Sequence, residues 1–448
     1  MIFPEDFIAS IKTAESFDEK AFIQIHSEPP PVSVRVNRKK NIQSFQSHLH
    51  IPWCETGYYL PERPKFTLDP LLHAGCYYVQ EASSMFLEYV LKQVVDFHTS
   101  IKVLDLCAAP GGKSTLISSL LNQKSFLVSN EVIRSRVNVL KENVTKWGDA
   151  NVIITNNDAV DFHKLENYFD VIVVDAPCSG SGLFRKDAKA LEEWSEENVI
   201  HCSRRQQRIL EDVIPALKQD GILIYSTCSY SVEENENIIN EILQLGFETK
   251  NPEVPEVWGV VKNESGFRFY PNKVKGEGFF ISVLKRVKKQ VNVNDDENYD
   301  LSNANIEKLT DDEIQVVKQW IDENTKVDFF KKGPMLFASP QNMFSDLEFL
   351  SSALKVIKAG VYCGEVKGKN FIPSHELALS TIIHPDLQEI AVDEESALNY
   401  LRKKEIETDS KIKGWALVKY KEHNLGWIKV LENRINNYYP MEWRIKSL

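Results

Sequence analysis

The sequence predicts an α/β fold built on a mostly parallel β-sheet with helices on both faces. Between about residues 100 and 287, short apolar runs alternate with helical stretches, as in parallel strands joined by crossover helices. Polar residues follow the end of each run, at the edge where such sheets bind ligands. The expected strands are Lys102–Cys107, Phe126–Asn130, Val152–Thr155, Val171–Val174 and Ile222–Ser226.

Residues 1–95 are expected to form a separate N-terminal domain. Phe7–Ile11 and Ala21–Ile25 predict short helices. The segment 32–40 then alternates apolar and polar residues, which is typical of a strand with one wet face. That face would carry Ser33, Arg35 and Asn37, which could meet phosphates, although an ordinary solvated strand fits equally well.

A glycine-rich loop follows the first strand of the sheet and reads Cys107-Ala108-Ala109-Pro110-Gly111-Gly112-Lys113. Glycines allow close approach of a ligand, and the following helix N-terminus offers free N–H groups, which suggests a nucleotide-like cofactor. A P-loop would need glycine where Cys107 stands, and a dinucleotide fingerprint would need another glycine inside the loop. S-adenosylmethionine is the third candidate, and a glycine-rich turn without a cofactor remains the alternative.

Two cysteines follow neighbouring strands of the predicted sheet: Cys178 in Asp175-Ala176-Pro177-Cys178, and Cys228 in Ser226-Thr227-Cys228-Ser229. A lone cysteine is usually apolar filler, but two beside an aspartate favour catalysis. A thiolate that adds to carbon 6 of a pyrimidine makes carbon 5 nucleophilic toward a methyl donor. A base must then remove the carbon 5 proton, and a carboxyl group near ring nitrogen 3, such as Asp175, would ease the addition.

These motifs resemble the Nol/Nop/Sun family of RNA cytosine-C5 methyltransferases. The resemblance implies a Rossmann-like domain at residues 96–289 that uses S-adenosylmethionine. In that family the cysteine after threonine is the nucleophile, here Cys228, and the cysteine after proline helps to release the product, here Cys178. DNA cytosine-C5 enzymes attack with the proline-linked cysteine, so the Thr-Cys motif favours RNA.

The resemblance also implies contacts with the cofactor and with RNA, and it makes residues 1–95 an N-terminal RNA-binding domain. Glu131 would hold the ribose hydroxyls, Asp158 would lie by the adenine, and Asp175 would meet the methionine end or the target base. The remaining implied contacts are the loop Cys107 to Lys113 and Arg136 for the cofactor, and Arg35, Asn37, Lys113 and Arg268 for RNA. For Lys113 and Arg136, a charged residue on a helix surface is the alternative.

The C-terminal region completes the expected domains. Residues 290–302 are polar and acidic and predict a linker, and Thr310–Glu313 is a capping box that begins a helix to about Asp322. The segments 360–367, 373–379 and 433–440 resemble the tail of the bacterial RsmF subtype, a 16S ribosomal RNA methyltransferase. That resemblance implies an intermediate domain at 303–390 and a PUA-like RNA-binding domain at 391–448. Trp415, Trp427 and Tyr439 could stack on bases, although aromatic residues more often form a core.

Composition limits the classes of protein. The 448 residues suffice for two to four domains, and no apolar run is long enough to cross a membrane. The seven cysteines are scattered and form no C-x-x-C pair, which favours reduced thiols and no metal site. The N-terminal segment is not basic, so we expect no signal peptide and a cytoplasmic protein. The net charge of −11 argues mildly against nucleic acid, but residues 262–289 hold eight Lys or Arg against two Glu.

We therefore expect a monomeric RNA (cytosine-C5)-methyltransferase that acts on 16S ribosomal RNA or the small ribosomal subunit, with transfer RNA as the second substrate candidate. A non-catalytic RNA-binding or ribosome-assembly factor on the same fold is one alternative, and the intact loop and both cysteines speak against it. A small-molecule methyltransferase is another, and methylation of oxygen or nitrogen needs no thiol pair.

Overall fold

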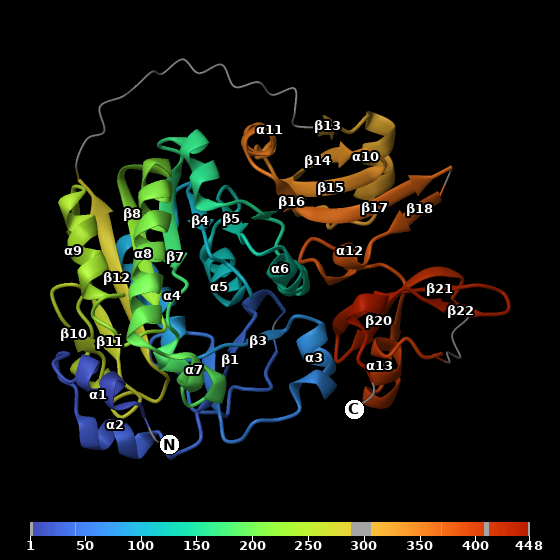
Figure 1. The fold of residues 1–448 in the computed structure, drawn as a ribbon. Coiled ribbons are helices and arrows are strands. Elements are labelled where there is room, and N and C mark those ends of the chain that lie inside the picture. The colour runs from blue at the N-terminus through green and yellow to red at the C-terminus, as the bar shows by residue number, and fades with distance from the viewer. Residues whose placement is uncertain (1–2, 41, 288–305, 369, 407–411, 447–448) are drawn as a thin grey trace.

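The computed structural model describes residues 3–40, 42–287, 306–368, 370–406 and 412–446 (Figure 1). The predicted linker 290–302 lies outside these residues. Among the described residues, no helix is both long enough and apolar enough to cross a membrane.

A ten-stranded sheet forms the centre of the molecule, and its main path runs β10-β11-β12-β8-β7-β4-β5-β6-β16. Strands β4 to β8 pair in parallel and confirm the predicted α/β fold, with β7 and β8 longer than expected. The strands are β4 Lys102–Asp105, β5 Phe126–Asn130, β6 Val152–Thr155, β7 Phe169–Asp175, β8 Leu217–Thr227, β9 Phe247–Thr249, β10 Val261–Lys262, β11 Phe267–Phe269, β12 Phe279–Arg286 and β16 Val356–Ala359.

Helices cover both faces of this sheet because successive strand side chains point to opposite sides. Val103 packs into the core on one face together with α4, α5 and α6, and Leu104 packs on the other face with α8, α9 and α11. The helices are α4 Phe86–Val94, α5 Gly112–Leu120, α6 Arg134–Trp147, α7 Ala188–Glu193, α8 Glu196–Val213, α9 Glu236–Gln244 and α11 Phe344–Ala353.

The N-terminal region adds a small sheet of order β2-β1-β3. Its elements are α1 Glu5–Ile11, α2 Glu19–Ile25, β1 Val32–Val36, β2 Gly57–Leu60, α3 Pro70–His73 and β3 Tyr77–Val79. The two predicted helices and the strand are confirmed.

The prediction that one face of β1 is exposed to solvent is wrong, because that face packs against the central sheet domain. Ser33, Arg35 and Asn37 are all buried. Arg35 donates hydrogen bonds to Gln80 Oε1 at 2.8 Å and Thr115 Oγ1 at 2.6 Å. Asn37 donates to the carbonyl oxygens of Gly75 and Trp147. An RNA-contacting role for Arg35 and Asn37 is therefore contradicted.

Two further sheets form the C-terminal region, with orders β13-β14-β15-β17-β18 and β19-β20-β21-β22. The predicted capping box at Thr310 is present and begins α10. The elements are β13 Glu307–Lys308, α10 Asp311–Lys318, β14 Val327–Lys332, β15 Met335–Pro340, β17 Val361–Lys367, β18 Asn370–Pro373, α12 His375–Leu379, β19 Glu389–Ala391, α13 Glu394–Leu401, β20 Gly414–Tyr420, β21 His423–Val430 and β22 Ile435–Asn437.

Among the described residues, the C-terminal region contacts the rest of the chain through β16, α11, α12 and its last sheet. Strand β16 pairs antiparallel with β6 and so extends the central sheet. The last sheet shares one apolar core with the N-terminal region, where α13 lies beside α3 (Figure 1). Trp427 and Tyr439 are buried, so stacking of these two rings on bases is contradicted, whereas Trp415 stays partly exposed.

Candidate active site

The glycine-rich loop connects β4 to α5 at the carboxyl edge of the sheet. Gly111 caps α5 with a φ of 110°, a left-handed conformation that favours glycine. Arg136 Nη2 donates to the carbonyl oxygen of Ala109 at 2.7 Å, and Asn143 Nδ2 donates to that of Pro110 at 2.8 Å. Helix α6 therefore fixes the loop from outside, and Arg136 acts on the loop backbone.

Two carboxylates lie buried beside this loop. Asp105 Oδ2 accepts a hydrogen bond from Ser114 Oγ at 2.7 Å, while Asp105 Oδ1 has no hydrogen-bond partner among the described residues. Burial raises the pKa of Asp105 to about 7. Glu131 accepts from the backbone N–H of Ile133 at 2.8 Å and forms an ion pair with Arg136 at 3.2 Å. Asp105 is the last residue of its strand and one of the polar residues expected at the strand ends, but the sequence assigned it no role in the site.

Asp158 and Cys107 also lie at the carboxyl edge of the sheet, and Asp158 is more exposed than Cys107. Asp158 accepts from the backbone N–H of Val160 and lies 3.7 Å from Arg208 Nη2, with 40% of its side chain exposed. Cys107 is mostly enclosed, and burial raises the pKa of its thiol. The structure thus brings the predicted cofactor residues to one edge of the sheet.

The two predicted cysteines meet at the ends of the adjacent parallel strands β7 and β8. Cys178 Sγ lies 3.1 Å from Cys228 Sγ, and both are free thiols. The hydrogen bond between the two thiols, together with burial, raises the pKa of Cys178 well above its usual range. Cys178 therefore keeps its proton at neutral pH.

Asp175 lies between the thiol loops and the glycine-rich loop. Its Oδ2 pairs with Lys113 Nζ at 2.7 Å, and its Oδ1 accepts from Ser226 Oγ at 2.8 Å. Lys113 Nζ also lies 5.2 Å from the ring centroid of Phe279. A carboxylate, an ammonium group and two thiols thus converge at one edge of the sheet, which suits covalent chemistry on a polar ring.

Parts of this chain match models of known protein families. Residues 92–285 match the family described as 16S rRNA methyltransferase RsmB/F. Three descriptions for RsmF match elsewhere: its N-terminal domain at 3–82, its first C-terminal domain at 317–380 and its PUA domain at 387–445.

Curated relatives match along nearly the whole chain. The ribosomal RNA small subunit methyltransferase F of Shewanella loihica is 30% identical over 95% of this chain and 91% of its own. The chain belongs to the RsmB/F family. The corresponding protein of Vibrio vulnificus strain YJ016 is 28% identical over 98% of this chain and 97% of its own. The expected resemblance is therefore confirmed.

A solved structure supports the methyltransferase fold of this RsmB/F chain. The methyltransferase homolog protein from Pyrococcus horikoshii has a TM-score of 0.55 and 26% identity, and the match covers 64% of this chain and 96% of that one.

Arg268 and Lys113, both predicted RNA contacts, are turned inward in this RsmB/F chain. The side chain of Arg268 is 2% exposed and forms an ion pair with Glu236. It also donates to the carbonyl oxygen of Tyr230 at 2.8 Å. Lys113 is 12% exposed and pairs with Asp175. Arg268 is therefore held inside the protein by Glu236 and Tyr230 and is not available to RNA in this fold. Lys113 serves the interior of the site through its ion pair with Asp175.

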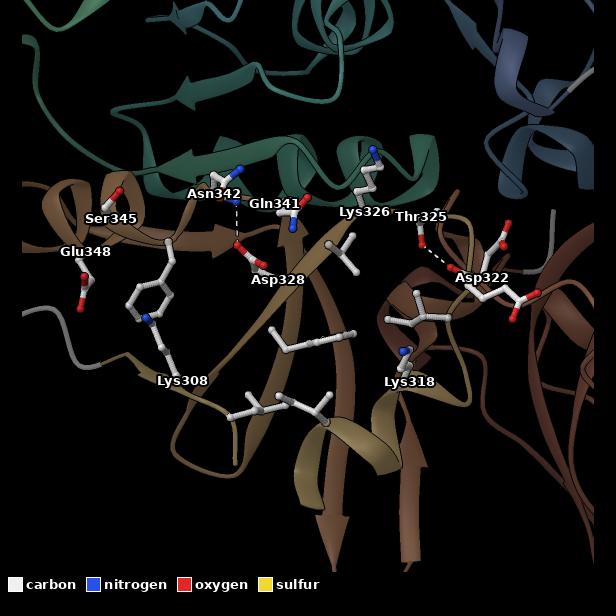
Figure 2. Close-up of a pocket in the computed structure, with 17 residues that line it drawn as sticks. Lys308, Lys318, Asp322, Thr325, Lys326, Asp328, Gln341, Asn342, Ser345 and Glu348 are labelled. Carbon is white, nitrogen blue, oxygen red and sulfur yellow. Dashed lines mark hydrogen bonds between the residues drawn. The ribbon is translucent and has the colours of Figure 1, made fainter. Parts of the chain in front are cut away.

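A separate hollow of about 960 Å³ lies over the C-terminal sheet near α10 and α11. Figure 2 shows lysines and carboxylates mixed around it, with Asp328 accepting from the backbone N–H of Asn342 and the carbonyl oxygen of Asp322 accepting from Thr325. None of the predicted site residues lines it. It is therefore not the methyltransferase site of this RsmB/F chain.

Proposed function

We propose that this protein methylates carbon 5 of a cytosine in 16S ribosomal RNA through a covalent bond between Cys228 and carbon 6 of the ring. The observation that carries this proposal is the pair of thiols, 3.1 Å apart beside Asp175. Methylation of oxygen or nitrogen needs no such pair, because those atoms are nucleophilic already. The family match supports the choice of ribosomal RNA.

We propose S-adenosylmethionine as the cofactor, and the residues at the carboxyl edge fit it. Asp105 Oδ1, which no described residue hydrogen-bonds, the buried Glu131 and the left-handed Gly111 form a polar cradle for a nucleoside. Glu131 would hold the ribose hydroxyls, Asp158 would lie by the adenine, and the loop Cys107 to Lys113 would line the methionine portion. When bound, the cofactor supplies an electrophilic methyl group on a sulfonium.

Side chains of the protein carry out the other steps of the reaction. Cys228 attacks carbon 6, and the protonated Cys178 donates a hydrogen bond that stabilises the Cys228 thiolate. Asp175, held by Lys113 and Ser226, orients the ring and assists the addition. A solvent base then takes the carbon 5 proton, and the electron pair of that C–H bond expels the Cys228 thiolate from carbon 6. Cys178 assists this release by donating its hydrogen bond to the departing sulfur.

We propose that the flanking regions 1–95, 303–390 and 391–448 hold the RNA against the 96–289 domain, in the cytoplasm. The exposed candidate surface lies on β20 to β22. Trp415 and Tyr438 have ring centroids 4.4 Å apart, and Lys429 Nζ lies 5.1 Å from the Trp415 centroid. An aromatic pair with a cation suits base stacking beside a phosphate.

Bisulfite sequencing of total RNA tests the proposal. A strain that lacks this gene should lose 5-methylcytosine at one position of 16S ribosomal RNA, and the wild-type gene should restore it. An unchanged 16S pattern, or a loss confined to transfer RNA, would contradict the substrate.

A further inference from the structure

Glu234 is a buried carboxylate that the proposed chemistry does not use. It lies in the turn between Cys228 and α9, and its side chain is fully enclosed. An enclosed carboxylate is unfavourable unless hydrogen bonds satisfy it. Its contacts therefore indicate what it does.

The Glu234 carboxylate joins the two cysteine loops. Oε1 accepts from the backbone N–H of Ser179 at 2.8 Å, and Oε2 accepts from the hydroxyls of Ser179 and Ser229, each at 2.5 Å. Ser179 directly follows Cys178, and Ser229 directly follows Cys228. One carboxylate thus fixes the residue next to each thiol.

Helix α8 completes this clamp. Gln206 Nε2 donates to Glu234 Oε1 at 3.1 Å and to the carbonyl oxygen of Pro177 at 3.0 Å. The hydroxyl of Tyr225 donates to the backbone carbonyl oxygen of Glu234 at 2.7 Å. Both the side chain and the main chain of Glu234 are therefore held by rigid elements.

We propose that Glu234 is a positioning residue that holds Cys178 and Cys228 in register for the two halves of the reaction. This inference rests on the proposed function, in which Cys228 attacks and Cys178 assists release. The strands alone do not set this distance, because each thiol lies beyond the end of its strand in a loop. Charged hydrogen bonds from both loops to one acceptor fix the loops relative to each other.

Two substitutions separate geometry from charge. Glu234→Ala removes every hydrogen bond that the Glu234 side chain makes. Glu234→Gln is isosteric: its oxygen accepts from the Ser179 N–H and from Gln206, and its amide donates to the two serine hydroxyls, which rotate to accept. Glu233→Ala is the matched control, because Glu233 is the preceding residue and its side chain is exposed.

The experiment uses full-length protein and 16S ribosomal RNA as substrate. Glu234→Ala should lower kcat about a hundredfold, the scale of a small misplacement of reacting groups, and change the KM for RNA far less. It should also accumulate RNA–protein adduct in denaturing electrophoresis, because Cys178 is displaced. Glu234→Gln should recover most of the lost turnover, and Glu233→Ala should match wild type. Calorimetry with S-adenosylmethionine reports whether the cofactor site of each variant is intact.

Other outcomes overturn the inference. Turnover of Glu234→Ala equal to that of Glu233→Ala would show that the clamp is not needed. If Glu234→Ala does not fold, Ser229→Ala is the second test, because it removes one hydrogen bond of the Glu234 carboxylate and leaves the others. It must give an intermediate loss of kcat with adduct accumulation, and normal kinetics there would refute the role. Cys178→Ala separates the two proposals. If Cys178→Ala forms the RNA–protein adduct and Glu234→Ala does not, only the clamp is refuted. If Cys178→Ala forms no adduct, the proposed function is refuted.

Discussion

Replacement of Arg35 by alanine should destabilise the protein and leave the intrinsic affinity of folded protein for RNA unchanged. Arg35 is 1% exposed, donates to Gln80 and Thr115, and lies 4.4 Å over the ring of Trp147. Burial lowers the pKa of Arg35 to about 10, so it remains charged at neutral pH. Removal of the side chain leaves Gln80 Oε1 unpaired and opens a cavity, and we expect a loss of about 3 kcal/mol.

Urea denaturation followed by circular dichroism measures this loss. Arg38→Ala is the matched control, because Arg38 is 57% exposed, pairs with the exposed Glu55 and should contribute less than about 1 kcal/mol. Arg35→Lys should restore little of the lost stability, since an ammonium group cannot hydrogen-bond to Gln80 and Thr115 and also stack on the ring of Trp147. An unchanged urea midpoint with a large loss of RNA affinity in Arg35→Ala would refute the burial argument.

Three further outcomes follow from the site. Glu131→Ala should weaken S-adenosylmethionine binding at least about tenfold by calorimetry, because charged hydrogen bonds contribute about 1.5–3 kcal/mol each; unchanged affinity would remove Glu131 from the cofactor site. Asp105 has its pKa raised from 3.8 to about 7, so the folded state keeps a proton that the unfolded chain loses. The free energy of unfolding should therefore fall as pH rises from about 4 to 7, by up to about 4 kcal/mol, and Asp105→Asn should flatten that dependence in urea titrations. Trp415→Ala should raise the KM for RNA about tenfold with little change in stability, whereas Trp427→Ala should lower the melting temperature.

The sequence was sufficient for features set by local pattern. Apolar runs bounded by polar residues predicted the parallel strands, because strands that are buried on both faces are rich in apolar side chains. The two cysteine motifs predicted that Cys178 and Cys228 would meet, since the carboxyl ends of neighbouring parallel strands share one edge. The roles of these residues in the reaction remain predictions.

Features set by distant parts of the chain could not be predicted. Alternation in 32–40 cannot distinguish water from a packed domain, and so Arg35 looked exposed although α5 and α6 cover it. Strand β16 comes from a region some two hundred residues after its partner β6, and short edge strands carry little signal. Glu234 stands in the acidic run 233–236, which reads as a solvated surface until its serine partners are located.

Adduct trapping with the two cysteine variants tests the central claim most directly. Each variant is incubated with S-adenosylmethionine and 16S ribosomal RNA and then examined by denaturing electrophoresis. Cys178→Ala should give a slow band that contains both RNA and protein, because the bond to carbon 6 breaks only after the carbon 5 proton leaves. Cys228→Ala and the double variant should give none. A band with Cys228→Ala and none with Cys178→Ala would reverse the two roles, and no band with either variant would contradict covalent catalysis.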